Sequence, residues 1–300
     1  MAIRNGTFKV RNTSTGEKDE VMLKTSVEQV EGLEAKLDAA DACYKKLLTV
    51  TGEEGNDAET SLLDRIPAHR RYRGKYLGTS FTAEQSAHVK DWSFEDLYVG
   101  DYWTINGVKW RIADICYYIN CGDQNDGCQT PHLVIVPDTV LYNQCMNASD
   151  VTTGAYIGSE MYKSGLNAAK TTIANAFSGH LLTIRHLFSN SVNGNVATGF
   201  EWVDATVWLM NEVAVYGTYC HTTWYNSDNG ANKWPSDKYS TDNTQYAAFA
   251  QNPRLIHTRQ TYWLRNVVLS TRFAHVGSYG DSGTRGASYA HGVRPTFCIS

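Results

Sequence analysis

The C-terminal segment, residues 262–300, constrains this chain more than any other stretch of its sequence. Two compact elements stand in it, Trp263-Leu264-Arg265 and Gly292-Val293-Arg294-Pro295, and residues 266–291 between them differ in character. This middle part contains glycines at three-residue spacing, at positions 277, 280, 283 and 286. Its apolar residues neither alternate cleanly nor form a helical stripe, so the pattern predicts an irregular, glycine-rich loop.

The side chains of residues 266–291 are typical of a binding surface. Tyrosine supplies rigid amphipathic area there, and serine and glycine supply adaptable hydrogen bonding. A loop that merely joins two strands is the alternative interpretation. Short polar side chains interrupted by glycine are poor core material, so we expect the following ligand-binding residues to be exposed on one face: Arg272, His275, Ser278, Tyr279, Asp281, Thr284, Arg285, Tyr289 and His291.

The two bracketing motifs resemble those of the variable proteins of diversity-generating retroelements. Many members of that family are C-type-lectin-like receptor-binding proteins at the tail ends of phages and prophages. Such motifs frame a segment there that mutagenic reverse transcription diversifies at adenines. Adenine-rich templates of that kind never yield Lys, Glu, Gln, Met or Trp, and residues 266–291 contain none of these five.

The resemblance extends from Trp103 to Pro295 and includes 99–103 (VGDYW), 132–138 (HLVIVPD) and 209–212 (LMNE). It implies an α+β, C-type-lectin-like fold of the formylglycine-generating-enzyme type for residues 91–300, with a variable segment at about 266–291. It also implies a receptor-binding tail protein whose hypervariable surface binds a protein or glycan on the host cell. The residues expected to act as scaffold rather than ligand contacts are Trp263, Arg265, Gly292 and Arg294.

Residues 1–90 are predicted to form a separate attachment and oligomerisation region. Short strands are expected around the turn Thr15-Gly16-Glu17. A helix follows, with a capping box at 26–29 and an apolar heptad stripe from Val30 to Leu47. The stripe is too short for a stable coiled coil on its own, and packing within its own domain is the alternative. Similarity of this region to tail attachment segments favours a homotrimer bound to phage tail or baseplate proteins.

Local patterns predict several elements of the larger domain. Asn106-Gly107 between two apolar runs indicates a β-hairpin. Residues 132–137 are expected to form a strand, and residues 166–177 and 203–215 are expected to form helices. The large rings of three tryptophans are expected in the core: Trp103, Trp110 and Trp263.

Charge limits the classes of partner that the chain can bind, and cysteine content bears on where it is made. The chain has a net charge of −4, but residues 254–300 contain six arginines and one acid, Asp281, so this part is basic and the remainder acidic. A basic face favours acidic groups such as those of surface polysaccharide. No lysine cluster or nucleic-acid motif is present, and no apolar run approaches the ~20 residues of a membrane span. Seven scattered cysteines and no signal peptide predict synthesis in a cytoplasm. The resemblance implies that this is a bacterial cytoplasm and that the protein has its place in the virion tail.

The patterns that suggest catalysis or a cofactor are weak. The set Cys116, Cys121, Cys128 and His132 lacks standard zinc spacing, and residues 122–127 offer calcium-type oxygens without a closing glutamate. We therefore expect no metal, no cofactor and no enzymatic activity. A formylglycine-generating-type enzyme remains the alternative, but it uses paired cysteines, and only Cys298 lies in the corresponding region. A structural tail protein without a receptor role is the third hypothesis.

Overall fold

The computed structural model describes residues 6–11, 18–23, 62–124, 127–222 and 244–300. The chain divides into two compact units, 1–59 and 60–300. In the first unit, strands β1 (Gly6–Arg11) and β2 (Lys18–Leu23) pair antiparallel, which confirms the short strands predicted there. The predicted helix with its heptad stripe lies outside the described residues.

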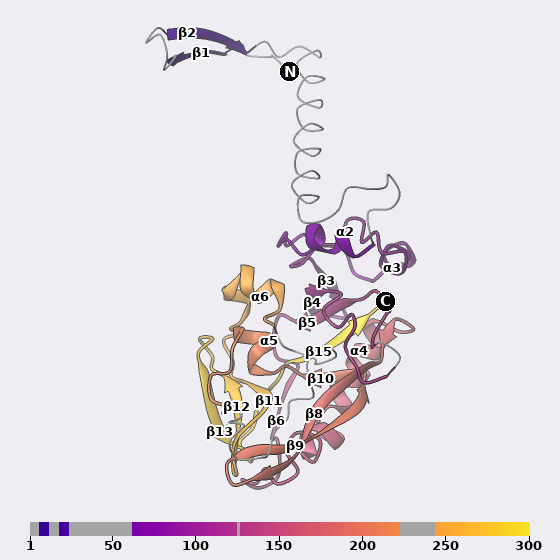
Figure 1. Cartoon of the computed structure of the whole chain (residues 1–300), viewed down its shortest axis with the longest axis vertical. Coiled ribbons are helices and arrows are strands. Elements are labelled where there is room, and N and C mark those ends of the chain that lie inside the picture. The colour runs from indigo at the N-terminus through magenta and orange to yellow at the C-terminus, as the bar shows by residue number, and fades with distance from the viewer. Residues whose placement is uncertain (1–5, 12–17, 24–61, 125–126, 223–243) are drawn as a thin grey trace. The chain divides into compact units, whose positions relative to one another are not determined.

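The second unit is a mixed α+β structure with many strands and few, short helices (Figure 1). Its larger sheet has the order β10-β15-β5-β4-β3, with β7 also paired to β15. Every pairing in this sheet is antiparallel. Its strands are β3 (Tyr102–Ile105), β4 (Val108–Ile115), β5 (Leu133–Pro137), β7 (Leu181–Leu182), β10 (Val207–Leu209) and β15 (Pro295–Ile299).

Two predictions from local sequence are confirmed in this sheet. Asn106 and Gly107 connect β3 to β4 with positive φ values of 52° and 78°, as a tight hairpin turn requires. The apolar run at 132–137 forms β5, all of whose residues are buried. A strand buried on both faces needs such a continuous apolar run.

The core beside the larger sheet is built from edge-to-face aromatic contacts. Trp110 lies with its ring centroid 5.7 Å from that of Phe177 and 5.5 Å from that of Phe297. Trp103 joins the same group, 6.2 Å from Phe177. Trp103, Trp110 and Trp263 are all fully buried, as predicted. Rings of this size contribute large buried apolar areas and fix the packing angle between elements.

A second sheet has the order β13-β12-β11-β14-β6, and Figure 1 shows β11, β12 and β13 side by side. It contains β6 (Tyr142–Gln144), β11 (Tyr262–Leu269), β12 (Arg272–Val276), β13 (Ser282–Gly286) and β14 (His291–Val293). Residue 294 is the single residue between β14 and β15, so the chain passes there from the second sheet to the first. The prediction of an irregular loop at 266–291 is therefore wrong: this segment contains the second half of β11, all of β12 and β13, and the first residue of β14.

Residues 266–291 form strands because neighbouring strands pair with them. Residues 272–276 pair with β11 on one side and with residues 282–286 on the other, and the periodicity of the segment itself does not reveal these pairings. The segment also contributes to the core, because Phe273, Ala274 and Val276 are buried.

A long two-stranded hairpin, β8 (Ile184–Asn193) with β9 (Val196–Ala205), completes the strands. The helix predicted at 203–215 is wrong for most of its length. Residues 203–205 end β9, 207–209 form β10, and only α5 (Glu212–Tyr216) is helical. The side chain of Asn211 accepts a hydrogen bond from the amide of Ala214 and so fixes the helix start at residue 212. Sheet pairing of Val207 and Trp208 with β15 outweighs the helical spacing that these residues also fit.

The helix predicted at 166–177 is confirmed as α4 (Asn167–Ala176). The remaining helical elements are α2 (Leu62–His69), α3 (Ala83–Lys90), α6 (Ala247–Gln251), a π-helical turn η1 (Met161–Gly165) and a 3-10 turn η3 (Pro253–Leu255). Among the described residues, no helix is both long and apolar enough to cross a bilayer.

Candidate functional site

The nine predicted ligand-binding residues lie on β12 and β13, at the start of β14 and in the connecting turns. None of the nine is buried. Tyr279 is 91% exposed and Tyr289 is 48% exposed. Two of the solvent-exposed tyrosines in the described part of the chain therefore belong to this set. Arg272, Asp281 and Arg285 are exposed as well, and the other four are half-buried.

The strand register divides these residues between two faces of the sheet. His275 pairs with Gly283 and Phe273 pairs with Arg285, whereas Ala274 pairs with Thr284 and Arg272 with Gly286. Directly opposed residues share a face and successive residues alternate. His275 and Arg285 therefore lie on one face, and Arg272 and Thr284 lie on the other. The expectation of a single face for all nine residues is wrong.

The first face, here called the display face, consists of His275, Arg285, Tyr289 and His291. The two histidine rings lie 5.1 Å apart by centroid. The guanidinium carbon of Arg285 lies 4.2 Å from the ring centroid of Tyr289, in a cation–π contact. These contacts pair a side chain of β12 with one of β14, and a side chain of β13 with one of the turn before β14.

Trp263 lies beneath the display face. Its ring centroid is 4.6 Å from that of His291 and 6.3 Å from that of His275. Its indole N–H donates to the carbonyl oxygen of Gln144 at 2.8 Å, so the ring is fixed by β6. The fully buried indole thus sets the height at which both histidines lie.

Burial keeps the two histidines of the display face neutral near pH 7. Desolvation lowers the pKa of His291 to about 4, and the nearby His275 and Arg285 lower it further. Desolvation also lowers the pKa of His275, and Asp281 partly opposes this effect. In the described structure, His275 Nδ1 and His291 Nε2 are enclosed and have no hydrogen-bond partner. A neutral imidazole tolerates such an environment better than an imidazolium.

Gly283 makes room for the His275 ring. A Cβ at this position would lie 2.6 Å from His275 Nε2 and 2.8 Å from Cε1. The imidazole therefore lies directly across the backbone of β13. A larger residue at 283 would displace the ring and change the shape of the display face.

Three residues, Ser278, Tyr279 and Asp281, occupy the turn between β12 and β13. The amide of Gly277 donates to the carbonyl oxygen of Asp281 at 2.7 Å, which closes the turn. The hydroxyl of Tyr216, in α5, donates to the carbonyl oxygen of Gly280 at 3.2 Å. The turn is therefore anchored from inside while the Tyr279 ring points to solvent.

On the opposite face, Arg272 Nη1 lies 3.5 Å from Thr284 Oγ1. Asp150 lies beside them, and its carboxylate accepts the amide of Ser288 at 2.8 Å. That hydrogen bond lowers the pKa of Asp150, with smaller contributions from the Ser288 side chain and from Arg272. This face combines a cation and an anion, unlike the display face.

The four predicted scaffold residues are buried and bind the ends of the segment. Arg294 donates from Nε to the Pro137 carbonyl oxygen at 2.9 Å and from Nη1 to that of Ile256 at 3.0 Å. Arg265 Nη1 donates to the Leu209 carbonyl oxygen at 3.1 Å. Arg265 thus links β11 to the edge strand β10, and Arg294 links the junction of β14 and β15 to β5, through charge-assisted hydrogen bonds.

Gly292 is required by close packing. A Cβ there would lie 2.3 Å from Val140 Cγ1 and 3.0 Å from the carbonyl oxygen of Thr261. The strand β14 can approach its neighbours this closely only without a side chain. We call Trp263, Arg265, Gly292 and Arg294 together the frame.

Sequence reasoning missed a loop that lies against the site. Glu212 is fully buried, and its carboxylate accepts the amides of Cys220, His221 and Thr222 at 3.3, 3.0 and 3.1 Å. The Cys220 side chain makes a hydrogen bond with Ser282 of β13. Because Cys220 and Ser282 are 62 residues apart in sequence, no local pattern could have revealed the contact.

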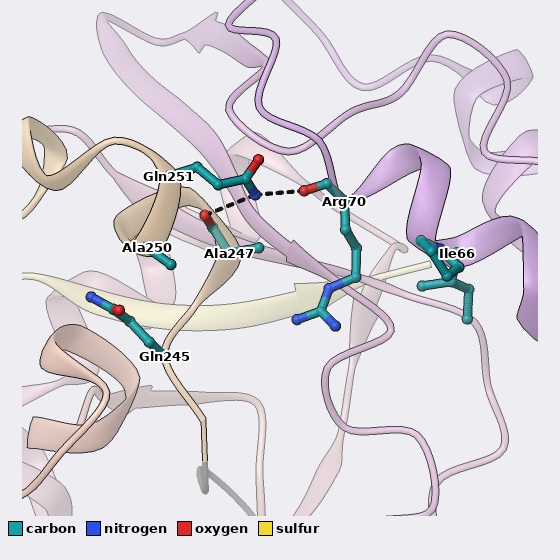
Figure 2. Close-up of a pocket in the computed structure, with 7 residues that line it drawn as sticks. Ile66, Arg70, Gln245, Ala247, Ala250 and Gln251 are labelled. Carbon is teal, nitrogen blue, oxygen red and sulfur yellow. Dashed lines mark hydrogen bonds between the residues drawn. The ribbon is translucent and has the colours of Figure 1, made fainter. Parts of the chain in front are cut away.

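Two of the cavities lined by described residues of the second unit are candidate ligand sites. One, of about 410 Å³, is lined by His257, Arg259, Ser278 and Tyr279, and it borders the turn that carries Tyr279. The other, of about 440 Å³, lies between α2 and α6 (Figure 2). In the second cavity, Gln251 Nε2 donates to the carbonyl oxygens of Arg70 and Ala247, at 2.7 and 3.1 Å. The cation that lines it, Arg70, forms an ion pair with buried Asp114 at 2.7 Å. We therefore interpret this cavity as a space left between the packed elements α2 and α6.

The cysteine and histidine group considered as a metal site has another role. His132 is fully buried; its Nδ1 lies 2.8 Å from the Thr130 carbonyl oxygen, and its Nε2 accepts the Tyr118 amide at 3.1 Å. Burial lowers its pKa to about 4, and burial raises the pKa of the Cys116 thiol to about 12. Both ring nitrogens are thus used by the backbone. Part of the calcium-type loop 122–127, residues 125–126, lies outside the described residues, and Asp123 in it pairs with Arg185 at 2.8 Å.

No protein-family model, curated protein or solved structure matches this chain significantly.

Proposed function

We propose that this chain is a receptor-binding protein of a phage or prophage tail, whose variable surface binds a protein or glycan on the host cell. One observation carries the proposal: the frame is buried, and every one of the nine predicted contact residues between its two halves is exposed or half-buried. A segment held rigidly at both ends can change its exposed side chains at little cost in stability.

We further propose a C-type-lectin-like fold for residues 91–300. The α+β architecture, rich in strands, is compatible with it. The last strand, β15, lies inside the larger sheet between β10 and β5, so the C-terminal segment is held by the core. Such a rigid base is what a diversified surface needs.

In this proposal, residues 1–90 attach the protein to phage tail or baseplate proteins in the virion, and the protein is a homotrimer. Three display faces in one assembly would raise avidity for repeated receptors without any new contact. Light scattering of the full chain across micromolar concentrations tests the oligomeric state. A trimeric mass is expected, and a monomeric mass would overturn this part of the proposal.

An enzyme of the formylglycine-generating type is the weaker alternative. That chemistry uses a pair of reactive cysteines, and Cys298 in β15 is fully buried and so is closed to a substrate. The thiolate, and not the thiol, is the reactive species, and burial raises the pKa of Cys116 and Cys128 as well. The chemistry of these thiols favours a binding protein over a catalyst.

The direct test is binding of the fluorescently labelled full chain to a panel of bacterial cells, measured by flow cytometry. A triple variant, Tyr279→Ala with Arg285→Ala and Tyr289→Ala, should lose most of the signal on the strain that binds. Tyr76→Ala is the matched control, because Tyr76 is 49% exposed and lies outside the site.

Equal binding by the triple variant and the control would contradict the proposal. The neighbouring DNA gives a second test. A reverse transcriptase gene with a near-repeat of the C-terminal codons would support a diversified receptor-binding protein over both a catalyst and a purely structural tail protein.

A further inference from the structure

The cavity beside the display face is formed by two segments that are distant in sequence. Ser278 and Tyr279 come from the turn between β12 and β13, and His257 and Arg259 come from the stretch between η3 and β11. The two walls touch behind the cavity, since a Cβ on Gly280 would lie 3.4 Å from His257 Cβ. Its volume of about 410 Å³ is within the ~300–1,000 Å³ range of small-ligand sites.

Arg259 places a positive charge at this cavity that no described acidic residue neutralises. The residue is exposed, and within the described part of the chain its guanidinium has no ion pair or hydrogen bond. Its backbone has a φ of 60°, in the left-handed region that residues with a Cβ rarely adopt. Among the described residues, no acid lines the cavity. Asp281, the nearest acid in sequence, packs its carboxylate over Gly277 instead.

The other lining residues suit a sugar ring. The Tyr279 ring is 91% exposed, so it offers a flat apolar face edged by a hydroxyl. Ser278 offers a hydroxyl, and His257 offers ring nitrogens that can donate or accept. A planar guanidinium can bind a carboxylate through two parallel hydrogen bonds.

We propose that this cavity binds one carboxylate-bearing sugar unit of a surface glycan, with Arg259 on the carboxylate and Tyr279 against the ring. The inference rests on the proposed function and deepens it, because it names the ligand class. It also assigns part of the binding to Arg259 and His257, which lie outside the variable segment 266–291. Every variant of the display face would then keep the same basic preference.

The observations favour a saccharide over an acidic peptide. A lone carboxylate would engage Arg259 but would leave most of the cavity, including the Tyr279 face, unused. A sugar ring with its acid group fills the space and uses all four lining side chains. An acidic peptide is nevertheless a defined outcome of the test.

The experiment titrates the full chain with three small probes and follows each by saturation-transfer NMR. The probes are methyl glucuronide, its neutral counterpart methyl glucoside, and N-acetylglutamate methylamide. The glucuronide should bind about tenfold more tightly than the glucoside, the size expected of one charge-assisted contact.

Arg259→Gln should abolish that preference, Arg259→Lys should retain part of it, and Tyr279→Ala should weaken both sugars. Arg259→Asn guards against a folding defect, because asparagine tolerates the left-handed backbone. Arg254→Gln is the matched control: it removes an exposed arginine from the same segment, on η3, outside the cavity lining.

Three results would each overturn the inference: no binding of the glucuronide, an equal affinity for both sugars, or a preference that survives Arg259→Gln. Binding of the glutamate probe as tight as that of the glucuronide would also overturn it in favour of an acidic peptide.

Cell binding separates this inference from the proposed function. If Arg259→Gln binds cells as the unmodified chain does, the cavity plays no part and the proposed function stands. If the chain binds glucuronide through Arg259 but binds no cells, the cavity assignment stands and the receptor-binding function fails.

Discussion

The frame and the display face lie within a few residues of each other, yet their surroundings are opposite. Trp263 and Arg294 are fully buried and bonded to elements of both sheets. Tyr279 and Tyr289 are the open rings of the same segment. One short stretch of chain therefore contains both residues that specify the fold and residues that can vary without disturbing it.

The largest effect should come from Trp263→Ala. The ring is fully buried, its N–H is bonded, and it supports both display-face histidines. Truncation of a large buried aromatic costs about 3–5 kcal/mol. Chemical denaturation of the full chain should show this loss, and a midpoint equal to that of the unmodified chain would mean that Trp263 is not part of the frame.

Arg294→Ala should follow, with a loss on the order of 1–3 kcal/mol, because it removes the guanidinium donors to the carbonyl oxygens of Pro137 and Ile256, of which Ile256 keeps the Tyr262 hydroxyl. Arg294→Lys should recover only part of the stability, since an ammonium cannot span the two acceptors as a guanidinium does. Full recovery by lysine would indicate that charge alone matters here.

Acidic pH should weaken the fold next. Folded His291 and His132 have pKa values of about 4, below the ~6.5 of an unfolded histidine. The unfolded chain therefore binds more protons between these values, and the stability present above pH 6.5 is lost as the pH falls towards 4. Thermal melts from pH 7 to pH 4.5 should show this loss, and His291→Asn should reduce its slope. An unchanged slope in His291→Asn would contradict a contribution of this ring.

Local sequence patterns predicted the elements that a few adjacent residues determine. The turn at Asn106-Gly107, strand β5 and helix α4 each follow from a few adjacent residues. The helix predicted at 203–215 failed because β15 pairs with Val207–Leu209 from the far end of the chain.

The sequence predicted which residues of the candidate site are exposed and which are buried, but not how they are arranged in space. Exposure followed from glycine and short polar residues, and burial of the frame followed from its large side chains. The division into two faces depends on the register of β12 with β13. The contribution of Arg259 and His257 depends on how two distant segments meet. Neither is encoded in the spacing of residues 266–291.

The smallest change in stability should come from Tyr279→Ala and Tyr289→Ala, each within about 0.5 kcal/mol of the unmodified chain. Their exposed rings make few contacts that folding must keep, although the contact of Tyr289 with Arg285 would be lost. Melting temperatures test this directly. A fall of more than a few degrees for either variant would place that tyrosine with the frame.

Saturation mutagenesis of residues 262–295, with each variant scored for protease resistance and for cell binding, separates scaffold from binding site position by position. Substitutions at the frame and at buried Phe273 and Val276 should remove protease resistance. Substitutions at Tyr279, Arg285 and Tyr289 should retain protease resistance and change only binding. The contrary pattern, in which frame variants stay folded and lose binding alone while variants at Tyr279, Arg285 and Tyr289 unfold, would show that scaffold and binding site have been exchanged.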